Sequence, residues 1–425
     1  MSIKKHSVTL DVSRCKGCTN CIKRCPTEAI RVRDGHATIK EDKCIDCGEC
    51  IRLCPYQAKK AIFDSLEDFA GYKYKIALPA PAFYGQFEDL DDIDEILTAL
   101  LECGFDAVVE VSRAAEIVTE YTRRYLKKEG LPKPIISSAC PAIVRLISLR
   151  FSYLTENLLP LMPPIEYAAR LARKEAMRDH PELSDSDICV LFISPCPAKV
   201  SYIKNPIGVT KSAVNGALAV SDMYFKTRAK RKEVKNPLPL SKTGIIGLNW
   251  AGTGGEATSL LSDKYLAADG IENCIKVLDQ IDSGTIHNLD FVELNACNGG
   301  CVGGTLNVEN PYIAKARLRS LRKYLPVSRN RVADDAENSV PREVMLDKEI
   351  EDSYSSSITT DRATAIRQMT AVEEIYKRLP KIDCGSCGAP NCHALAEDII
   401  KGEAEETDCL IKLRDIYIAN EPEDN

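Results

Sequence analysis

CKGCTNCIKRCP (residues 15–26) and CIDCGECIRLCP (residues 44–55) are two cysteine runs that decide the fold of the amino-terminal part of this chain. Each run has the spacing C-x2-C-x2-C-x3-C and ends directly before a proline. Structural zinc sites use two short cysteine pairs, and disulfide frameworks are typical of short secreted domains rather than of chains of 425 residues. The spacing therefore predicts iron-sulfur clusters held by thiolates, with zinc and disulfides as the alternatives.

The repeated run resembles that of bacterial two-cluster ferredoxins. In those proteins each run gives three thiolates to one 4Fe-4S cube, and its fourth cysteine, before proline, binds the other cube. By that rule the ligands of the two cubes are Cys15, Cys18, Cys21 and Cys54 for the first, and Cys44, Cys47, Cys50 and Cys25 for the second. Residues 1–72 are accordingly expected to form a ferredoxin-like α+β domain.

The composition indicates a multidomain protein without a membrane segment. A chain of 425 residues has room for several domains with sizeable cores. No apolar run approaches the roughly 18 residues that cross a bilayer, and the first residues lack an apolar signal core. Thiolates also need a reducing compartment. We therefore expect a cytoplasmic, oxygen-sensitive protein that binds neither membranes nor nucleic acid.

Positive charge is concentrated near the amino terminus, although the formal net charge of the chain is −6. Residues 1–60 contain thirteen Lys or Arg and seven Asp or Glu. Two explanations remain open. The surplus balances two buried anionic cubes, each with a net charge of about −2, or it forms a docking face for an acidic electron carrier.

Residues 73–325 alternate short apolar strands with amphipathic helices, which is typical of an α/β domain. Most of the candidate strands are rich in Val, Ile or Leu, as buried parallel strands are. They are Tyr74–Leu78, Ala107–Val111, Pro134–Ser137, Ile188–Ile193, Thr243–Leu248 and Phe291–Leu294. A helix is expected over residues 93–101, capped by Gly104. The domain should therefore contain mostly parallel sheets covered by helices.

Four segments with unusual composition begin where these strands end. They start at Ser138, Ser194, Trp250 and Ala296. Because ligands of open parallel sheets bind beyond the carboxyl ends of the strands, the segments are expected to converge on one site. Three of them supply four thiols, those of Cys140, Cys196, Cys297 and Cys301. The last two cysteines would lie one helical turn apart. The alternative is that Cys140 and Cys196 are small buried core residues.

These segments resemble the three sequence motifs of the iron-only (FeFe) hydrogenases. The matching stretches are SSACP (137–141), SPCPAK (194–199) and ELNACNGGCVGG (293–304), and the likeness extends over roughly residues 1–325. The resemblance implies an H-cluster, whose 4Fe-4S cube would be held by Cys140, Cys196, Cys297 and Cys301. Cys301 would also bridge to a diiron unit that carries carbon monoxide, cyanide and an azadithiolate.

The same resemblance assigns further pocket residues. Lys199 matches the family lysine whose ammonium donates to a cyanide ligand. A buried ammonium needs such an anionic partner because its unpaired burial is costly. A surface lysine on a loop is the alternative. Ala80 and Pro81 match a stretch that lines the family pocket.

Three positions depart from the family pattern. Ala139 stands where hydrogen-producing members carry a second cysteine that relays protons, and alanine cannot relay a proton. Ser194 and Asn295 replace two methionines beside the diiron unit, which makes the pocket more polar. General acid-base catalysis is typically worth about 100- to 10,000-fold, so loss of the relay predicts slow turnover unless another acid has taken over.

Glu256 is the candidate replacement acid. It follows two glycines, at a predicted strand exit where the family usually has an apolar residue. A carboxyl group near a helix start can instead stabilise the helix dipole, and both interpretations remain open.

The carboxyl end adds a third group of cysteines. Residues 326–365 are polar and acidic, as linkers are. A helix is expected over Arg362–Leu379, and residues 366–425 contain Cys384, Cys387, Cys392 and Cys409. This spacing resembles the small Fe-S domain of corrinoid iron-sulfur proteins and of sensory hydrogenase-like proteins. It predicts one more 4Fe-4S cluster, with zinc as the alternative.

Together these patterns predict an iron-only hydrogenase with three accessory 4Fe-4S clusters and an H-cluster. It would interconvert dihydrogen with protons and electrons slowly, in hydrogen sensing or redox regulation. Expected partners are a ferredoxin-like redox protein or a separate signalling protein, and maturation proteins for the diiron unit. The alternatives are a non-catalytic Fe-S protein that acts in cluster assembly or electron transfer, and a metabolic enzyme that feeds ferredoxin, which Ala139 does not favour.

Overall fold

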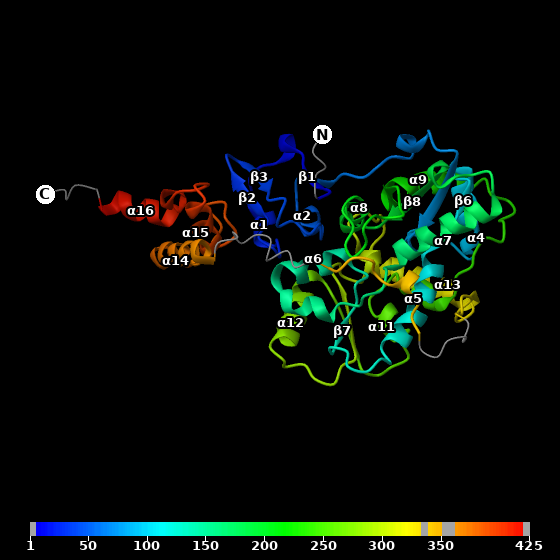
Figure 1. Cartoon of the computed structure of the whole chain (residues 1–425). Helices are drawn as coiled ribbons and strands as arrows, with labels where there is room; N and C mark the ends of the chain where they lie inside the picture. Colours follow the sequence, from blue (N-terminus) through cyan, green and yellow to red (C-terminus); the bar gives the residue numbers. More distant parts are fainter. Residues whose placement is uncertain (1–5, 333–338, 351–361, 420–425) are drawn as a thin grey trace. The chain divides into compact units, whose positions relative to one another are not determined.

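The computed structural model describes residues 6–332, 339–350 and 362–419 (Figure 1). The chain divides into two compact units. The first consists of residues 1–44, 48–61 and 352–425, and the second consists of residues 45–47 and 62–351. Most of the acidic stretch near residue 335 and the serines at 355–357 lie outside the described residues.

The amino-terminal part of the first unit has two similar halves, as the repeated cysteine runs predict. In each half the run forms one short helix, and a strand follows the fourth cysteine. The helical elements are η1 (Val12–Arg14), α1 (Asn20–Lys23) and α2 (Glu49–Arg52). The strands pair antiparallel, β1 (Val8–Leu10) with β4 (Lys59–Ala61) and β2 (Ile30–Arg33) with β3 (His36–Ile39). The predicted ferredoxin-like α+β fold is confirmed.

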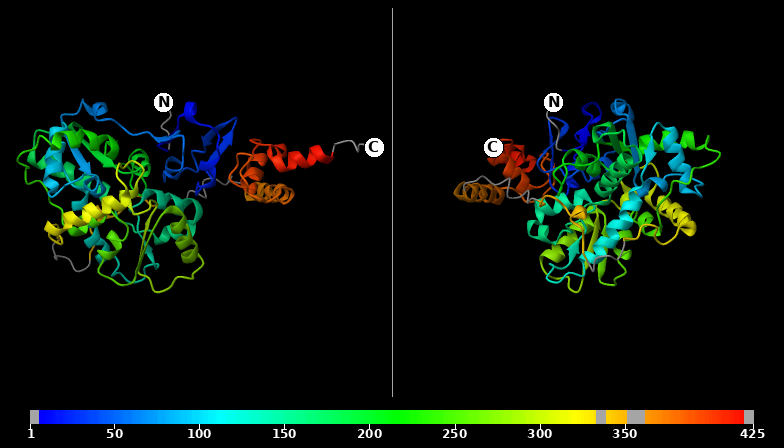
Figure 2. Two further views of the ribbon diagram at one scale, coloured as in Figure 1. Left: turned by 180° about the vertical axis from the view of Figure 1, so that it is seen from behind. Right: turned by 45° about the vertical axis from the view of Figure 1, so that its right-hand side comes forward.

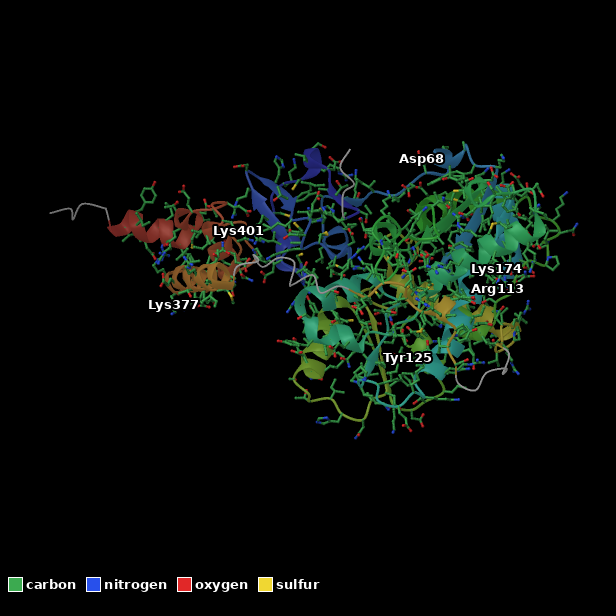
Figure 3. The ribbon with its side chains drawn as sticks, in the orientation of Figure 1. Asp68, Arg113, Tyr125, Lys174, Lys377 and Lys401 are labelled. Carbon is green, nitrogen blue, oxygen red and sulfur yellow. The ribbon has the colours of Figure 1, made fainter. Side chains whose placement is uncertain are left out.

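The carboxyl-terminal part of the first unit is helical. Its elements are α14 (Arg362–Arg378), α15 (Cys392–Ile400), η8 (Glu406–Asp408) and α16 (Leu410–Ala419). Val372, Ile375 and Leu395 form a small core together with Cys392 and Cys409. Lys377 and Lys401 extend from this part into solvent (Figure 3). The predicted helix is present and ends one residue earlier than expected.

The second unit contains a parallel sheet with helices on both faces (Figures 1 and 2). Its strands, in spatial order, are β6 (Ala107–Val108), β5 (Tyr74–Pro79), β8 (Ile188–Ser194) and β9 (Gly216–Ala219). Cys189, Leu191 and Ile193 share a core with residues of α4 (Ile93–Glu102) and α9 (Val220–Arg231). Helix α7 (Pro164–Asp179) packs against β5 and β8, and α5 (Val111–Tyr125) packs against α7.

A second parallel sheet lies in the same unit. Its spatial order is β10 (Tyr265–Asp269), β11 (Phe291–Asn295) and β7 (Ile135–Ile136). Val292 and Leu294 face a core shared with α6 (Pro141–Arg150) and α12 (Ile271–Asp282), whereas Phe291 faces the opposite core. The prediction of parallel sheets covered by helices is therefore confirmed.

Shorter helices connect these elements. The α-helices are α3 (Pro81–Tyr84), α8 (Pro197–Lys204), α10 (Ile245–Asn249), α11 (Gly255–Thr258) and α13 (Pro311–Leu321). The 3-10 turns are η2 (Leu66–Phe69), η3 (Ser152–Asn157), η4 (Asp185–Asp187), η5 (Cys301–Gly303), η6 (Arg322–Tyr324) and η7 (Arg342–Val344). Arg113 on α5 donates to Glu175 on α7 at 2.9 Å, which ties these two helices together (Figure 3).

One predicted strand is wrong. Residues predicted as the strand Thr243–Leu248 mostly form α10, which packs against α5. A Cβ added at Gly247 would lie 2.1 Å from the Ser112 carbonyl oxygen, so only glycine permits this close approach of two helices. The structure also contains β9 and β10, which the sequence did not indicate because alanine and glycine make up most of β9 and alanines lie at the centre of β10.

The boundaries of the two units differ from the predicted domain boundaries at residues 72 and 326. Residues 62–72 belong to the second unit, where the Asp64 carboxylate accepts from the Ala217 amide at 2.9 Å. The buried Glu116 carboxylate accepts from the amides of Arg329 and Asn330 at 2.9 and 3.0 Å. Because a buried carboxylate needs donors, this start of the predicted linker packs on the second unit.

Within the described ranges, none of the helices combines the length and apolarity that a membrane span requires.

Candidate functional site

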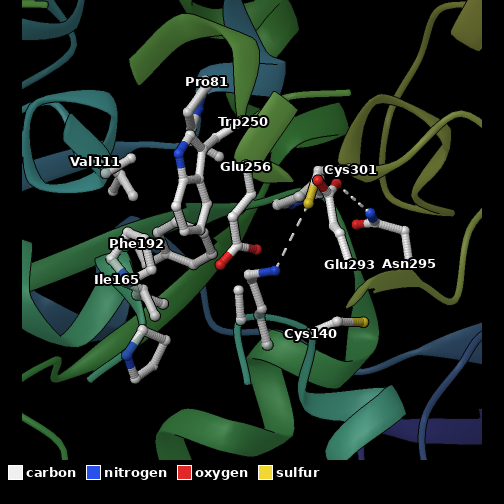
Figure 4. Close-up of a pocket in the computed structure, with 17 residues that line it drawn as sticks. Pro81, Val111, Cys140, Ile165, Phe192, Trp250, Glu256, Glu293, Asn295 and Cys301 are labelled. Atoms are coloured by element: carbon white, nitrogen blue, oxygen red, sulfur yellow. Dashed lines mark hydrogen bonds between the residues drawn. The ribbon is translucent and has the colours of Figure 1, made fainter. Parts of the chain in front are cut away.

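Four strands of the second unit end at one pocket (Figure 4). Beyond β5 lies Pro81, beyond β7 lies Cys140, beyond β8 lies Pro195, and β11 ends at Asn295. All four residues line the pocket, two from each parallel sheet. The expected convergence at the carboxyl ends of the strands is therefore present.

Lys199 lies among the four cysteines of the central segments. Its Nζ donates to Cys301 Sγ at 3.8 Å (Figure 4). Burial alone would lower the pKa of this ammonium, but the charges of Cys301, Cys196, Cys140 and Cys297 together raise it above its ordinary value. The structure thus brings the four sulfurs and the lysine into one neighbourhood, where Lys199 stays charged when these cysteines are thiolates.

The thiols at this site resist ionisation on their own. Burial raises the pKa of Cys196 to about 11, although Lys199 opposes the shift. Burial also raises the pKa of Cys301. Metal binding deprotonates coordinating thiols, so this donor set fits an iron-sulfur cube that supplies the positive charge the thiolates need.

The loop from Cys297 to Cys301 is not the helical turn that the spacing suggested. Gly299 and Gly300 have φ values of +85° and +86°, which side chains rarely adopt. A Cβ at Gly300 would lie 2.5 Å from the Thr253 amide nitrogen. The glycines therefore let this loop and the segment after α10 approach each other closely behind the cysteines.

Glu256 is buried on the pocket wall. It lies in the single turn α11 rather than at a strand exit, and its side chain is 4% exposed. Ser137 Oγ donates to Glu256 Oε2 at 2.6 Å, whereas Oε1 has no hydrogen-bond partner among the described residues. Figure 4 shows the carboxyl group pointing into the pocket. An unpartnered buried oxygen facing a cavity is available to a ligand.

Glu293 is the residue that sequence reasoning missed. It lies on β11 and accepts from the amides of Gly254 and Ala257 at 3.0 and 2.9 Å, at the start of α11. Asn295 Nδ2 adds a third donor at 2.8 Å. The helix-dipole role considered for Glu256 therefore falls to Glu293. One signal was present in the sequence: a single carboxylate interrupts the apolar strand FVELN.

The two glutamates form a coupled buried pair. Burial, and then the neighbouring Glu293 charge, raise the pKa of Glu256 well above its ordinary value, and burial also raises the pKa of Glu293. Two adjacent carboxylates cannot both ionise easily in a dry site. Because Glu293 holds three donors and Glu256 only one, we place the negative charge on Glu293 and the proton on Glu256.

The remaining predicted pocket residues differ in position. Ala80, Ala139 and Asn295 line the pocket with Pro81. The Ala139 amide donates to Ser137 Oγ at 3.2 Å, so position 139 is linked to Glu256 through one serine. Ser194 is buried behind the wall, where its hydroxyl donates to the Cys196 carbonyl at 2.9 Å.

Accessory cysteines of the first unit gather in two places. Cys15, Cys21, Cys25 and Cys50 pack against one small apolar core. Burial raises the pKa of Cys21, and the neighbouring Cys18 and Cys15 contribute to the shift. The four carboxyl-terminal cysteines, which line one pocket, are Cys384, Cys387, Cys392 and Cys409. All cysteines of the chain lie within the described ranges, and no disulfide joins any of them.

The basic surplus of the amino-terminal part meets the acidic side chains of the carboxyl-terminal part. Asp398 is 1% exposed and pairs with Arg31 through Nη2 at 3.0 Å and with Lys40 at 2.7 Å. Lys43 pairs with Glu397 at 3.2 Å. The Val32 amide donates to the Gly388 carbonyl at 2.8 Å. The charge complementarity expected for an acidic electron carrier is thus satisfied within the first unit.

Comparison with known families agrees with this site. The family "iron only hydrogenase large subunit, C-terminal domain" matches residues 73–224 and 253–305. A 4Fe-4S dicluster domain matches residues 7–55, and an Fe-S cluster family matches residues 379–411.

Two curated proteins are similar in sequence. The periplasmic Fe hydrogenase large subunit of Nitratidesulfovibrio vulgaris is 26% identical over 400 residues, which cover 78% of this chain and 93% of that protein. A component of an ion-translocating oxidoreductase complex from Rhodobacter capsulatus is 48% identical over 48 residues, or 11% of this chain and 26% of that protein.

Solved structures share the fold. The FeFe-hydrogenase HydA(deltaEFG) gives a TM-score of 0.51 at 16% identity, over 66% of this chain and 95% of that one. A variant of FeFe-hydrogenase HydA1 from Chlamydomonas reinhardtii gives 0.51 at 15% identity with the same coverage. The fold and the cysteine-lined pocket define an iron-sulfur oxidoreductase of the hydrogenase class. The chain contains a domain that matches the iron-only hydrogenase large-subunit family, together with a two-cluster ferredoxin domain and a further Fe-S domain.

Proposed function

We propose that this protein is a cytoplasmic, oxygen-sensitive hydrogenase that interconverts dihydrogen with protons and electrons slowly, and that it serves hydrogen sensing or redox regulation. One observation carries the proposal: four cysteines from the ends of three strands surround Lys199, beside a buried acid. When bound, the H-cluster would supply the redox chemistry.

The residues of the chain divide the remaining tasks. Cys140, Cys196, Cys297 and Cys301 would hold the cube, and the Lys199 ammonium would hold an anionic ligand of the diiron unit. Val111, Ile165, Phe192 and Trp250 form apolar walls that exclude water. Glu256 would hold the proton at Oε1, which faces the pocket and lacks a hydrogen-bond partner among the described residues. Glu293 would keep that proton in place by its charge.

Slow turnover is supported by position 139. The alanine methyl group lines the pocket where a thiol would serve as relay, and the remaining acid is held in a fixed pair with Ser137. A slow enzyme suits sensing better than bulk hydrogen metabolism, since a sensor needs dihydrogen to occupy its site but does not need a high rate of turnover.

A regulatory role is also supported by the carboxyl-terminal Fe-S domain. Its loop residue Gly385 lies next to Ile22, which follows Cys21 in the first cysteine run. Backbone pairing of Val32 with Gly388 and the buried Asp398 ion pairs hold the two parts together. Electrons would therefore pass through the ferredoxin clusters to this domain, and from there to a ferredoxin-like or signalling partner.

Replacing Asp398 with asparagine should undock the carboxyl-terminal part. Removing one member of a buried ion pair typically destabilises the folded state by about 3–5 kcal/mol. Burial would raise the Asp398 pKa, but hydrogen bonds from Arg31 and Lys40 lower it below its ordinary value of 3.8. The docking energy is therefore present above that pH and is lost as the pH falls below it.

Hydrogen exchange of residues 28–33 and 385–391 should accelerate in the Asp398→Asn variant. Glu403→Gln, which affects only an exposed partner of Lys40, is the control. Unchanged exchange in Asp398→Asn would contradict the docking role.

Infrared spectroscopy tests the central proposal. After maturation with the diiron complex, the protein should show carbon monoxide and cyanide stretching bands, and Cys301→Ser should lack them because it removes the thiolate that would hold the diiron unit. If the parent protein binds the cubes but shows no such bands, the chain acts instead as a non-catalytic Fe-S protein in cluster assembly or electron transfer.

A further inference from the structure

The two halves of the ferredoxin-like part are built alike around their fourth cysteines. The Ala29 amide donates to Cys25 Sγ at 3.2 Å, and the Ala58 amide donates to Cys54 Sγ at 3.2 Å. The next residue begins a strand in both halves, Ile30 in β2 and Lys59 in β4. Ile30 and Lys59 therefore occupy equivalent positions, and each is 2% exposed. One half buries an apolar side chain where the other buries a cation.

Lys59 has no partner in the described part of the chain that explains its burial. Its Nζ is shielded from solvent and has no hydrogen-bond acceptor among the described residues. The neighbouring Lys60, by contrast, is half exposed and pairs with Asp11 at 3.0 Å. An isolated buried ammonium costs far too much free energy to be retained without a negative partner. The partner must therefore be a group that the protein atoms alone do not include.

The ammonium charge reaches the thiols of one predicted cube. It acts on Cys21 and on Cys54, which come from different cysteine runs and share only the first cube. At both thiols the lysine favours the ionised form, against the effect of burial. A 4Fe-4S cube with four thiolates carries a net charge of about −2 and offers sulfur acceptors, so it fits the missing partner.

We propose that Lys59 is the buried cation of the cube held by Cys15, Cys18, Cys21 and Cys54, and that it sets the reduction potential of this cube above that of the other ferredoxin-type cube. Reduction adds one electron, taken from dihydrogen oxidation or from an added reductant, and changes the cube charge from about −2 to about −3. A buried ammonium stabilises the more negative state, whereas Ile30 in the other half does not.

The difference in reduction potential between the two cubes favours electron transfer to the cube beside Lys59. Ile22, directly after Cys21, lies next to Gly385 of the carboxyl-terminal Fe-S domain. The cube with the higher potential therefore has a ligand, Cys21, directly before a residue that contacts that domain, and electrons on this cube would be near the proposed exit. This consequence rests on the proposed function, but the potentials themselves can be measured without a diiron unit.

A redox titration of the full chain, reconstituted with iron and sulfide and followed by electron paramagnetic resonance, tests the proposal. Lys59→Ile copies the residue of the other half. We expect the equilibrium constant for reducing the cube that Cys21 and Cys54 hold to fall about tenfold. For a one-electron couple this is a shift of about 59 mV to lower potential. Lys59→Arg should keep the parent potential, and Lys60→Ile is the matched control.

The converse variant keeps the test decisive if Lys59→Ile fails to bind the cube. Ile30→Lys should raise the potential of the other cube. The proposal is overturned if neither variant moves a potential, or if Lys60→Ile moves the same cube as far as Lys59→Ile. Absence of carbon monoxide and cyanide bands alongside the expected shifts would reject only the hydrogenase function.

Discussion

Replacing Glu256 with glutamine is expected to lower hydrogen oxidation by the matured enzyme by about 100- to 10,000-fold, the usual worth of a positioned acid or base. Glutamine keeps the acceptor oxygen for Ser137 but cannot release or take up a proton. Hydrogen-dependent reduction of a dye measures the rate, and infrared bands of the H-cluster should stay unchanged because Glu256 is not a ligand.

A stability measurement separates this role from a structural one. The Glu256 pKa is raised in the folded state, so the folded protein keeps a proton that the unfolded chain loses above its ordinary value of 4.5. Stability therefore falls as the pH rises, and Glu256→Gln removes this loss. The variant should melt at the same or a higher temperature than the parent, increasingly so at alkaline pH.

Glu110→Gln is the matched control for Glu256→Gln. Glu110 is also a buried carboxyl group, and burial raises its pKa to about 7, but it lies outside the pocket and bonds to Tyr84 and to the Lys242 amide. Its variant should retain parental turnover. If Glu256→Gln turns over as fast as Glu110→Gln, Glu256 does not relay protons.

Replacing Ala139 with cysteine is expected to raise turnover, within the same range of about 100- to 10,000-fold. The alanine methyl group lines the pocket, so a thiol built on it faces the same cavity as Glu256. A thiol has a pKa near 8.5 and can exchange protons at neutral pH. Dye-linked assays in both directions measure the gain.

Ala139→Ser separates acidity from size, because a serine hydroxyl is similar in volume but a far weaker acid. It should gain little. The double variant Ala139→Cys with Glu256→Gln should recover most of the activity that Glu256→Gln loses, since the thiol bypasses the carboxyl group. An Ala139→Cys variant no faster than the parent would reject the missing relay as a cause of the proposed slow turnover.

The site could be predicted only in part. Cys140, Cys196 and Lys199 were assigned from local motifs; Cys140 and Lys199 line one pocket, and Cys196 lies close to both. Glu256 was selected because a carboxyl group followed two glycines, but its surroundings were misjudged, since α10 and not a strand precedes it. Strand and helix compete closely in such a short apolar stretch, and packing against α5 decided the outcome.

Glu293 shows why the rest could not be predicted. Its partners Gly254 and Ala257 lie 39 and 36 residues earlier in the chain, and only the closure of β11 against α11 brings them together. A pattern of neighbouring residues contains no signal for such a pair. The same holds for Asp398, whose partner Arg31 is 367 residues away.

The sequence by itself determined the ligand chemistry of this protein, because the spacing of metal-binding residues is a local property of the chain. Short segments were enough to identify the cysteine runs, the Lys199 motif and the carboxyl-terminal cysteines. Only the tertiary structure decided which charges are buried and what they face. Burial of Lys59, Glu256, Glu293 and Asp398 depends on elements that meet from distant parts of the chain, and the free-energy cost of burying a charge then determines which partner each one requires.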